Sequence, residues 1–274
     1  MSTPLHIATD NGHHNAVSLL LRAGADVNAV NEHGSYAIHL ATIKGYVTIV
    51  KELLNYGTSI DVTDAEDGIP VNGDTYYYNA PLHIAVIGKN VELVEILLQH
   101  GASVNVSNIT GKTPLHLAVQ CRSRPILELL LKHGADIHQK DVDAECRELS
   151  PLEHAILNNS TINNDMARTM LQHCNSKEDI HHAIYHAVRY NNMEVSKYLL
   201  NEMSIDVNHI YDEEHGYTLM HYALMHHDIN MDMIELLKSK GSNMVKNLDI
   251  VLQRHAQQKK NEIDLSLSDD SYDE

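Results

Sequence analysis

A six-residue phrase that returns along the chain constrains its fold more than any other feature. Its clearest copies are Thr3 to Ala8, Ala80 to Ala85 and Thr113 to Ala118, each reading Thr or Ala, then Pro-Leu-His, then Ile or Leu, then Ala. The phrase histidine falls at 6, 39, 83, 116 and 221, and the first and third intervals are both 33 residues. A period of this length indicates similar units that stack, because one such unit cannot bury its own apolar face.

Each copy of the phrase predicts a pair of short helices. Proline suits the first helical turn and threonine can cap it. A second helix follows after a turn and carries an apolar stripe, as in the stretch 91–98. Glycine is expected to end this second helix, at Gly24, Gly57, Gly101 and Gly134. A β-turn segment then leads to the next copy, so the sequence predicts helix–turn–helix units joined by turns.

The phrase, the period and the hairpin sequence Gly24 to Asn28 recur together, with variants of the hairpin at Gly101 and Gly134. In these features the chain resembles the ankyrin-repeat family along nearly its whole length. The resemblance implies an all-α fold with short β-hairpin turns, a solenoid of about seven units over residues 1–247. It also implies that the phrase histidines hydrogen-bond a helix to the neighbouring hairpin.

Units in the stretch 143–212 depart from the family pattern. Glu153 replaces the phrase histidine, the run Ser160 to Asp165 is expected to lengthen a helix–helix turn, and Tyr185 stands at the histidine position of the sixth unit. That sixth unit also has no usual hairpin before it. After the last unit, residues 248–260 are expected to form a closing helix, and residues 261–274 an acidic, disordered tail.

One insertion separates the second and third units. The interval between the phrase histidines at 39 and 83 is 44 residues, and the excess falls in residues 64–78. Insertions in a solenoid map to loops on one face, often the binding face. The tyrosines at the end of the insertion therefore either contact a partner or pack on the second unit within a tolerated insertion.

The acidic balance of the chain limits its partners. Its net charge is −17, from 20 basic and 37 acidic residues, which argues against binding nucleic acid or an anionic membrane and is compatible with a basic protein partner. No stretch approaches the length of a bilayer span, and no secretion leader precedes the first repeat. The three cysteines form no paired pattern. We therefore expect a protein that is monomeric when alone, intracellular and cytoplasmic, or in a host's cytoplasm or nucleus if it is an effector.

The 21 histidines raise the alternative of a metal site or of catalysis. His182 and His186 are four apart on one expected helix, a spacing that two ligands could use, but no carboxylate or thiolate joins them in sequence. The chain has no glycine-rich phosphate loop, no Gly-x-Ser-x-Gly and no His-Glu-x-x-His. We therefore expect no metal, no cofactor and no catalytic residue, and assign the histidines structural roles.

In the ankyrin family the partner usually lies in a concave groove formed by hairpin tips and first helices. The resemblance thus implies a non-enzymatic protein–protein interaction module, for instance a host-directed effector. An inhibitor of NF-κB is the alternative, because about six such units followed by an acidic tail resemble those inhibitors; a metal-binding or catalytic protein is a further one. The partner-binding residues implied by the groove are Glu32, His33, Ser35, Lys44, Tyr76, Tyr77, Asn79, Ile109, Lys112, Arg189, Tyr190 and Tyr217.

Two kinds of modification are also suggested by pattern. Asn28 and Asn208 each follow Asp-Val and stand eight residues after a leucine, which resembles the ankyrin asparagine that an oxygen-sensing hydroxylase modifies. Ser266 and Ser271 have acids three residues later, as in substrates of acidophilic kinases. The alternatives are that the asparagines belong to the fold and that the tail only solvates the chain.

Overall fold

The computed structural model describes residues 1–64, 79–142, 148–174, 176–226 and 229–243. Within these ranges the chain forms seven pairs of helices and one short strand pair, which confirms the predicted all-α ankyrin solenoid. The chain divides into two compact bodies, the N-terminal body Met1–Ala155 and the C-terminal body Ile156–Glu274. The predicted stretches 248–260 and 261–274 lie outside the described residues, as do residues 65–78 of the insertion.

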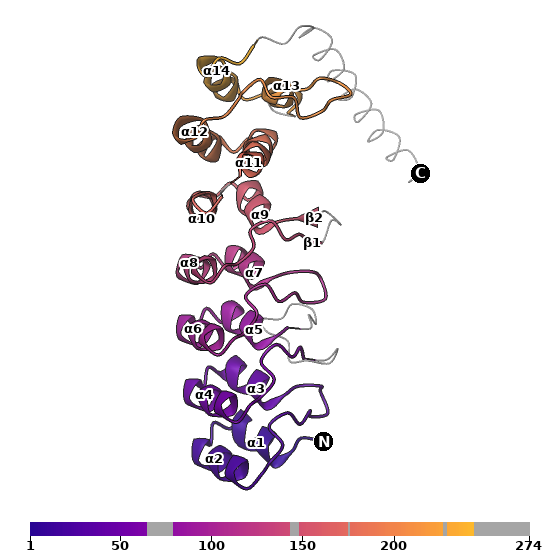
Figure 1. Cartoon of the computed structure of the whole chain (residues 1–274), viewed down its shortest axis with the longest axis vertical. Coiled ribbons are helices and arrows are strands. Elements are labelled where there is room, and N and C mark those ends of the chain that lie inside the picture. The colour runs from indigo at the N-terminus through magenta and orange to yellow at the C-terminus, as the bar shows by residue number, and fades with distance from the viewer. Residues whose placement is uncertain (65–78, 143–147, 175, 227–228, 244–274) are drawn as a thin grey trace, which may run out of the picture. The chain divides into compact units, whose positions relative to one another are not determined.

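The N-terminal body holds repeats one to four and the start of repeat five. In Figure 1 the first helices α1, α3, α5 and α7 lie on the side from which the hairpins project, and α2, α4, α6 and α8 form the opposite layer. Strands β1 and β2 pair antiparallel, with Asp141 opposite Leu149. The elements are α1 (Pro4–Asp10), α2 (His14–Arg22), α3 (Ala37–Lys44), α4 (Val47–Asn55), α5 (Pro81–Ile87), α6 (Val91–Gln99), α7 (Pro114–Gln120), α8 (Arg124–Lys132), β1 (Asp141–Val142) and β2 (Glu148–Leu149).

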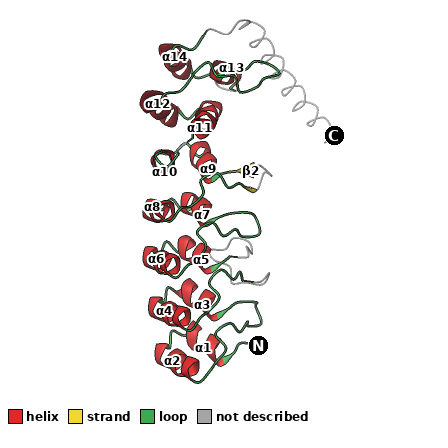
Figure 2. Ribbon diagram, viewed as in Figure 1, coloured by secondary structure: helices red, strands yellow, loops and turns green. Residues whose placement is uncertain are grey.

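The boundary between the bodies falls inside α9, whose residues up to Ala155 belong to the N-terminal body, and the C-terminal body holds the helices that follow. Helix α10 leads to α11 without an intervening hairpin, as the sequence predicted (Figure 2). A hairpin does precede α13, where Asp212 bridges Tyr217. The elements are α9 (Pro151–Leu157), α10 (Thr161–Leu171), α11 (Lys177–Arg189), α12 (Met193–Glu202), α13 (Leu219–Met225) and α14 (Met231–Ser239).

Local sequence explains where these helices begin and end. Thr3 caps α1 from an extended backbone and its side chain accepts the N–H of His6, while Pro4 occupies the first turn. The glycines after the second helices adopt left-handed backbone, with φ of 85° at Gly24 and 89° at Gly101. A residue with a Cβ is disfavoured there. The predicted glycine stops are therefore confirmed, one residue beyond the helix cap.

The apolar stripes of the second helices form the core of the stack. In α6, Leu93 and Leu97 are fully buried, and in α8 the same is true of Ile126 and Leu130. Their spacing of four residues places each pair on one helix face. Truncating such a buried leucine to alanine typically costs about 2–5 kcal/mol. The core therefore runs between adjacent repeats, as stacking requires.

The polar run at Ser160 to Asp165 is helical, so the prediction of a lengthened turn is wrong. Ser160 is the N-cap of α10 and accepts the N–H of Asn163. Asn164 is buried, and its Oδ1 accepts a hydrogen bond of 2.8 Å from Nδ2 of Asn192. Nδ2 of Asn192 also donates to the carbonyl of Ile156, at 2.8 Å. The hydrogen bonds of Asn164 and Asn192 thus take the place of apolar contacts on the buried face of this helix.

Candidate partner-binding surface

Four phrase histidines connect each first helix to the next hairpin. The Nδ1 of His39 accepts the N–H of Tyr36, and that of His83 accepts the N–H of Ala80. The proton is therefore on Nε2, which donates to a backbone carbonyl. The four bonds are His6 to Ser35 (3.1 Å), His39 to Val62 (3.0 Å), His83 to Lys112 (3.0 Å) and His116 to Leu149 (3.2 Å). The structural role implied by the family is confirmed at these positions.

Burial fixes the charge state of these histidines. His39 and His83 are completely buried. Loss of solvation lowers the pKa of each to about 4, against an ordinary value of 6.5, although hydrogen bonds to carbonyls partly offset the shift. Both rings are therefore neutral near pH 7, as the donor and acceptor roles of their two nitrogens require.

The hairpins are also tied to one another by asparagines. Oδ1 of Asn28 accepts the N–H of Ser59 at 2.8 Å, and Oδ1 of Asn208 accepts the N–H of Asn243 at 2.8 Å. Each bond reaches the segment that follows the next second helix, α4 for Asn28 and α14 for Asn208, so both asparagines have a role in the fold. Their hydroxylation stays a prediction.

Several predicted partner residues of the N-terminal body are exposed. Ile109 is 64 % exposed at a hairpin tip. Glu32 and His33 stand at the tip of an earlier hairpin, and Glu32 lies 3.2 Å from the amino group of Met1. Lys44, at the end of α3, lies 3.5 Å from Asp10 of α1. These four side chains expose apolar, acidic, basic and imidazole groups to solvent, and their contact with a partner stays a prediction.

Two other predicted contact residues are inside the protein. Ser35 is 1 % exposed and Asn79 is 6 % exposed. The carbonyl of Ser35 accepts the bond from His6, and Oδ1 of Asn79 accepts one from Asn108 at 3.3 Å. These positions lie at the base of a hairpin, where side chains hold the neighbouring repeat, so they are corrected to structural residues. Lys112 is half-buried, while Tyr76 and Tyr77 lie outside the described residues.

Aromatic packing replaces the histidine bond in repeat six. Tyr185 stands at the histidine position and stacks on Tyr211 of the next hairpin, with ring centroids 5.5 Å apart and an interplanar angle of 22°. It also meets Tyr222 edge-on at 4.8 Å. Offset and edge-on pairs of this kind are each worth about 0.5–1.5 kcal/mol beyond the buried area. The rings therefore connect α11 to the following hairpin and to α13.

The predicted partner residues of the C-terminal body surround this aromatic group. Arg189 is exposed, donates to the hydroxyl of Tyr185 and lies 5.7 Å from its ring centroid. Tyr190 stacks on His186 at 5.7 Å, and Tyr217 stacks on His221 at 5.2 Å. Both tyrosines are half-buried. The contributions of Tyr211 and Tyr222 were missed: Tyr211 belongs to no motif, and Tyr222, although it follows the phrase histidine His221, was not expected to contact Tyr185.

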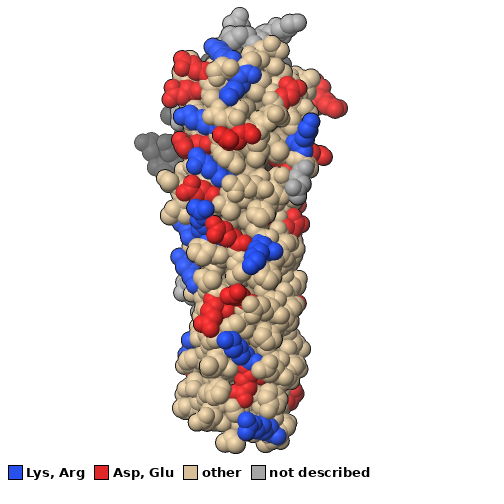
Figure 3. Space-filling model, turned by 60° about the vertical axis from the view of Figure 1, so that its left-hand side comes forward, with Lys and Arg blue, Asp and Glu red and all other residues tan. Residues whose placement is uncertain are grey.

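The second helices present a different surface. Figure 3 shows acidic and basic side chains interspersed over this face. Lys51 of α4 lies 3.7 Å from Glu92 of α6, and Arg168 of α10 lies 3.0 Å from Glu194 of α12. Exposed pairs of this kind contribute little to stability. The face shown in Figure 3 carries no large area of one sign.

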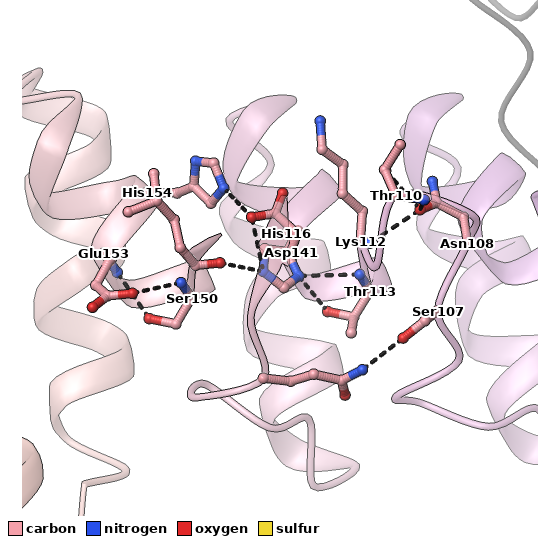
Figure 4. A network of polar contacts seen from close by, with 12 residues as sticks. Ser107, Asn108, Thr110, Lys112, Thr113, His116, Asp141, Ser150, Glu153 and His154 are labelled. Atoms are coloured by element: carbon pink, nitrogen blue, oxygen red, sulfur yellow. Dashed lines mark hydrogen bonds and ion pairs between the residues drawn. The ribbon is translucent and has the colours of Figure 1, made fainter. Parts of the chain in front are cut away.

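A polar network surrounds the strand pair of repeat five (Figure 4). Glu153 replaces the phrase histidine and accepts the N–H of Ser150 at 2.6 Å, which preserves the helix cap. The next residue, His154, places Nε2 2.8 Å from Oδ1 of Asp141. The same Oδ1 lies 3.8 Å from Nε2 of His116. Sequence inspection missed this group because its members come from α7, β1 and α9.

Comparison with known proteins agrees with this geometry. A family model described as ankyrin repeats, in three copies, matches residues 1–64, 69–141 and 152–247. The chain belongs to the ankyrin-repeat family. Ankyrin repeats mediate binding between proteins. No helix of the described ranges is long and apolar enough to cross a membrane.

Individual relatives match short segments of this ankyrin-repeat chain. An ankyrin repeat protein of Rickettsia bellii is 44 % identical over 61 residues, covering 22 % of this chain and 26 % of the relative. The nuclear factor NF-kappa-B p105 subunit of Gallus gallus is 36 % identical over 66 residues, 24 % of this chain and 7 % of the relative. Human protein phosphatase 1 regulatory subunit 27 is 33 % identical over 66 residues, which cover 24 % of this chain and 43 % of the relative. The chain thus spans less than half the length of each of these relatives.

Proposed function

We propose that this chain is a non-enzymatic module that binds a protein partner in the groove formed by its hairpin tips and first helices. The observation that carries the proposal is that the base of a hairpin and its tip have different roles. The base is buried and bonded to the neighbouring repeat, as at Ser35, whereas the tip exposes Glu32 and His33. A rigid support with varied exposed side chains at its tips suits recognition of another protein.

The excess of acids favours a partner with a basic surface. The net charge of −17 would speed the encounter with such a partner and disfavour nucleic acid or an anionic membrane. Salt screens this attraction between opposite charges and so shortens its range. We accordingly propose an intracellular, cytoplasmic location, where a folded ankyrin module would meet its partner as a monomer.

Two narrower roles follow from the family resemblance. A host-directed effector would bind a protein of the host cell, and an NF-κB-inhibitor-like regulator would bind a transcription factor of that type. The match to the p105 subunit covers 66 residues, about two repeats, and therefore supports the repeat rather than the inhibitor role. The effector role is the broader proposal and we place it first.

Site-specific photo-crosslinking tests the groove. A photoreactive amino acid replaces Ile109 at an exposed hairpin tip or, as the matched control, Glu95 on the exposed face of α6. We expect a discrete crosslinked protein from cell lysate with the probe at 109 and none with the probe at 95. Crosslinking from 95 alone would refute the groove. Identification of the captured protein distinguishes the effector role from the NF-κB-inhibitor-like role.

A further inference from the structure

His116, Asp141 and His154 form a compact group of potential metal ligands in the N-terminal body. One nitrogen or oxygen atom of each lies within 4.8 Å of those of the others. Oδ1 of Asp141 is 2.8 Å from Nε2 of His154 and 3.8 Å from Nε2 of His116. In a tetrahedral zinc site with bonds of 2.0–2.1 Å, ligand atoms are about 3.3 Å apart. Small side-chain rotations would therefore bring the three atoms to ligand distances.

Asp141 has an unsatisfied buried oxygen. Its side chain is fully buried, and its Oδ2 has no hydrogen-bond partner. Buried carboxylates without full compensation are costly, and coordination to a cation is one of the usual compensations. Asn108, which is 33 residues before Asp141, has partners for its side-chain oxygen. Its Oδ1 accepts the backbone N–H of Thr110 and of Lys112 at 3.1 and 3.0 Å.

His154 is also specific to repeat five. In the first four repeats, the residue after the phrase histidine is aliphatic: Ile7, Leu40, Ile84 and Leu117. In repeat five this position carries an imidazole, whose Nε2 points to the carboxylate of Asp141 (Figure 4). The imidazole, which the first four repeats lack at this position, thus meets the buried carboxylate of Asp141.

We propose that His116, Asp141 and His154 bind a divalent transition-metal ion of the zinc class. Two imidazoles and a carboxylate are ligands that zinc accepts, and three protein ligands leave a position for water. The double positive charge would compensate the buried carboxylate. Since the ligands come from α7, β1 and α9, the ion would fix the strand pair against the helices on either side.

The proton on His116 sets the cost of binding. Nδ1 of His116 accepts the N–H of Thr113 at 3.0 Å, so Nε2 carries the proton and donates to Leu149. To ligate through Nε2, the ring must carry its proton on Nδ1 instead, where Oγ1 of Thr113, at 2.9 Å, can accept it. Binding therefore gives up the bonds from the Thr113 N–H and to the Leu149 carbonyl. The loss of these two bonds weakens the binding of the ion.

The test titrates the metal-free full chain with Zn²⁺ and Co²⁺ in a buffer that does not bind metal. His154→Leu and Asp141→Asn remove the ligands but restore residue types that the chain's other repeats carry at these positions, so both variants should fold. His182→Ala is the matched control, because His182 is exposed and lies four residues from His186. Calorimetry gives stoichiometry and affinity, the visible absorption of bound Co²⁺ reports coordination, and thermal unfolding reports stability.

We expect one ion per wild-type chain, with a higher melting temperature when metal is added. His154→Leu and Asp141→Asn should each weaken binding by about 100-fold or more, since even outer-shell changes typically cost 10–100-fold. His182→Ala should bind as the wild type does. No stoichiometric binding by the wild type, or equal affinity in the wild type and His154→Leu, would overturn the site. Loss of binding in His182→Ala alone would assign the ion to α11 instead.

Discussion

Acid should destabilise the N-terminal body through its buried histidines, and His83 is the position at which to measure this. His83 is completely buried, and burial lowers its pKa to about 4 from an ordinary 6.5. Because the pKa is lower in the folded state, the stabilising contribution is complete above about 6.5 and is lost as the pH falls toward 4. His39 has the same pKa and should behave in the same way.

The magnitude follows from the two pKa values. At pH 7 the ring is neutral in both states and contributes almost nothing to pH dependence. At pH 5 the unfolded chain is protonated at this position, while the folded chain is not. Each pKa unit is worth about 1.4 kcal/mol, so the 1.5 units between 6.5 and pH 5 cost about 2 kcal/mol for this residue.

The assay compares the wild type with His83→Gln in urea unfolding and amide hydrogen exchange at pH 7 and pH 5. Exchange of the amides in α5 and α6 reports on the N-terminal body. The variant should be less stable at pH 7, by roughly 1–3 kcal/mol, because a buried carbonyl loses its donor. Glutamine does not titrate, so the gap should close by about 2 kcal/mol at pH 5. The exposed His182→Gln is the control variant, and a constant gap between the wild type and His83→Gln would refute the reasoning.

Three further predictions concern positions where the structure isolates one interaction. Asn192→Ala removes the donor to the Ile156 carbonyl and to Asn164. In urea unfolding it should lower the free energy of unfolding of the C-terminal body by about 2–4 kcal/mol. The control Asn201→Ala, at an exposed position, should cost under about 0.5 kcal/mol. Tyr185→Ala removes two ring contacts of a half-buried side chain and should cost about 1–3 kcal/mol; no measurable loss would mean that the aromatic group does not stabilise this body. At Gly101, φ is 89° and an added Cβ meets nothing within 4 Å, so Gly101→Ala should cost only the backbone strain of about 1–2 kcal/mol in thermal unfolding.

The regular repeats could be predicted because their signals are local. Thr3 and Pro4 specify a helix start, and Gly101 specifies a stop, from the chemistry of one or two residues. The role of the phrase histidine also follows from its place in the period. Where the structure follows these signals, sequence and fold agree.

The irregular part could not be predicted because its partners are distant in sequence. Asn164 looked like a turn residue, and only its pairing with Asn192, 28 residues later, makes it suitable for a buried helix face. Likewise Asp141 is 25 residues from His116, and their spacing in the sequence did not predict that the two side chains lie close together. Tyr185 was placed at the histidine position, but its stacking on Tyr211 required the fold of the hairpin. Long-range polar and aromatic contacts replace the local pattern in each case.

Hydrogen exchange of the chain, free and bound to the protein captured by the Ile109 probe, tests the proposed function most directly. The account predicts slower exchange on binding at the hairpin tips, at His33 and Gly34 and at Thr110 and Gly111. It predicts no change in the exposed faces of α4 and α6. Protection confined to α4 and α6, with the hairpin tips exchanging as in the free chain, would contradict the proposal that the partner lies in the groove.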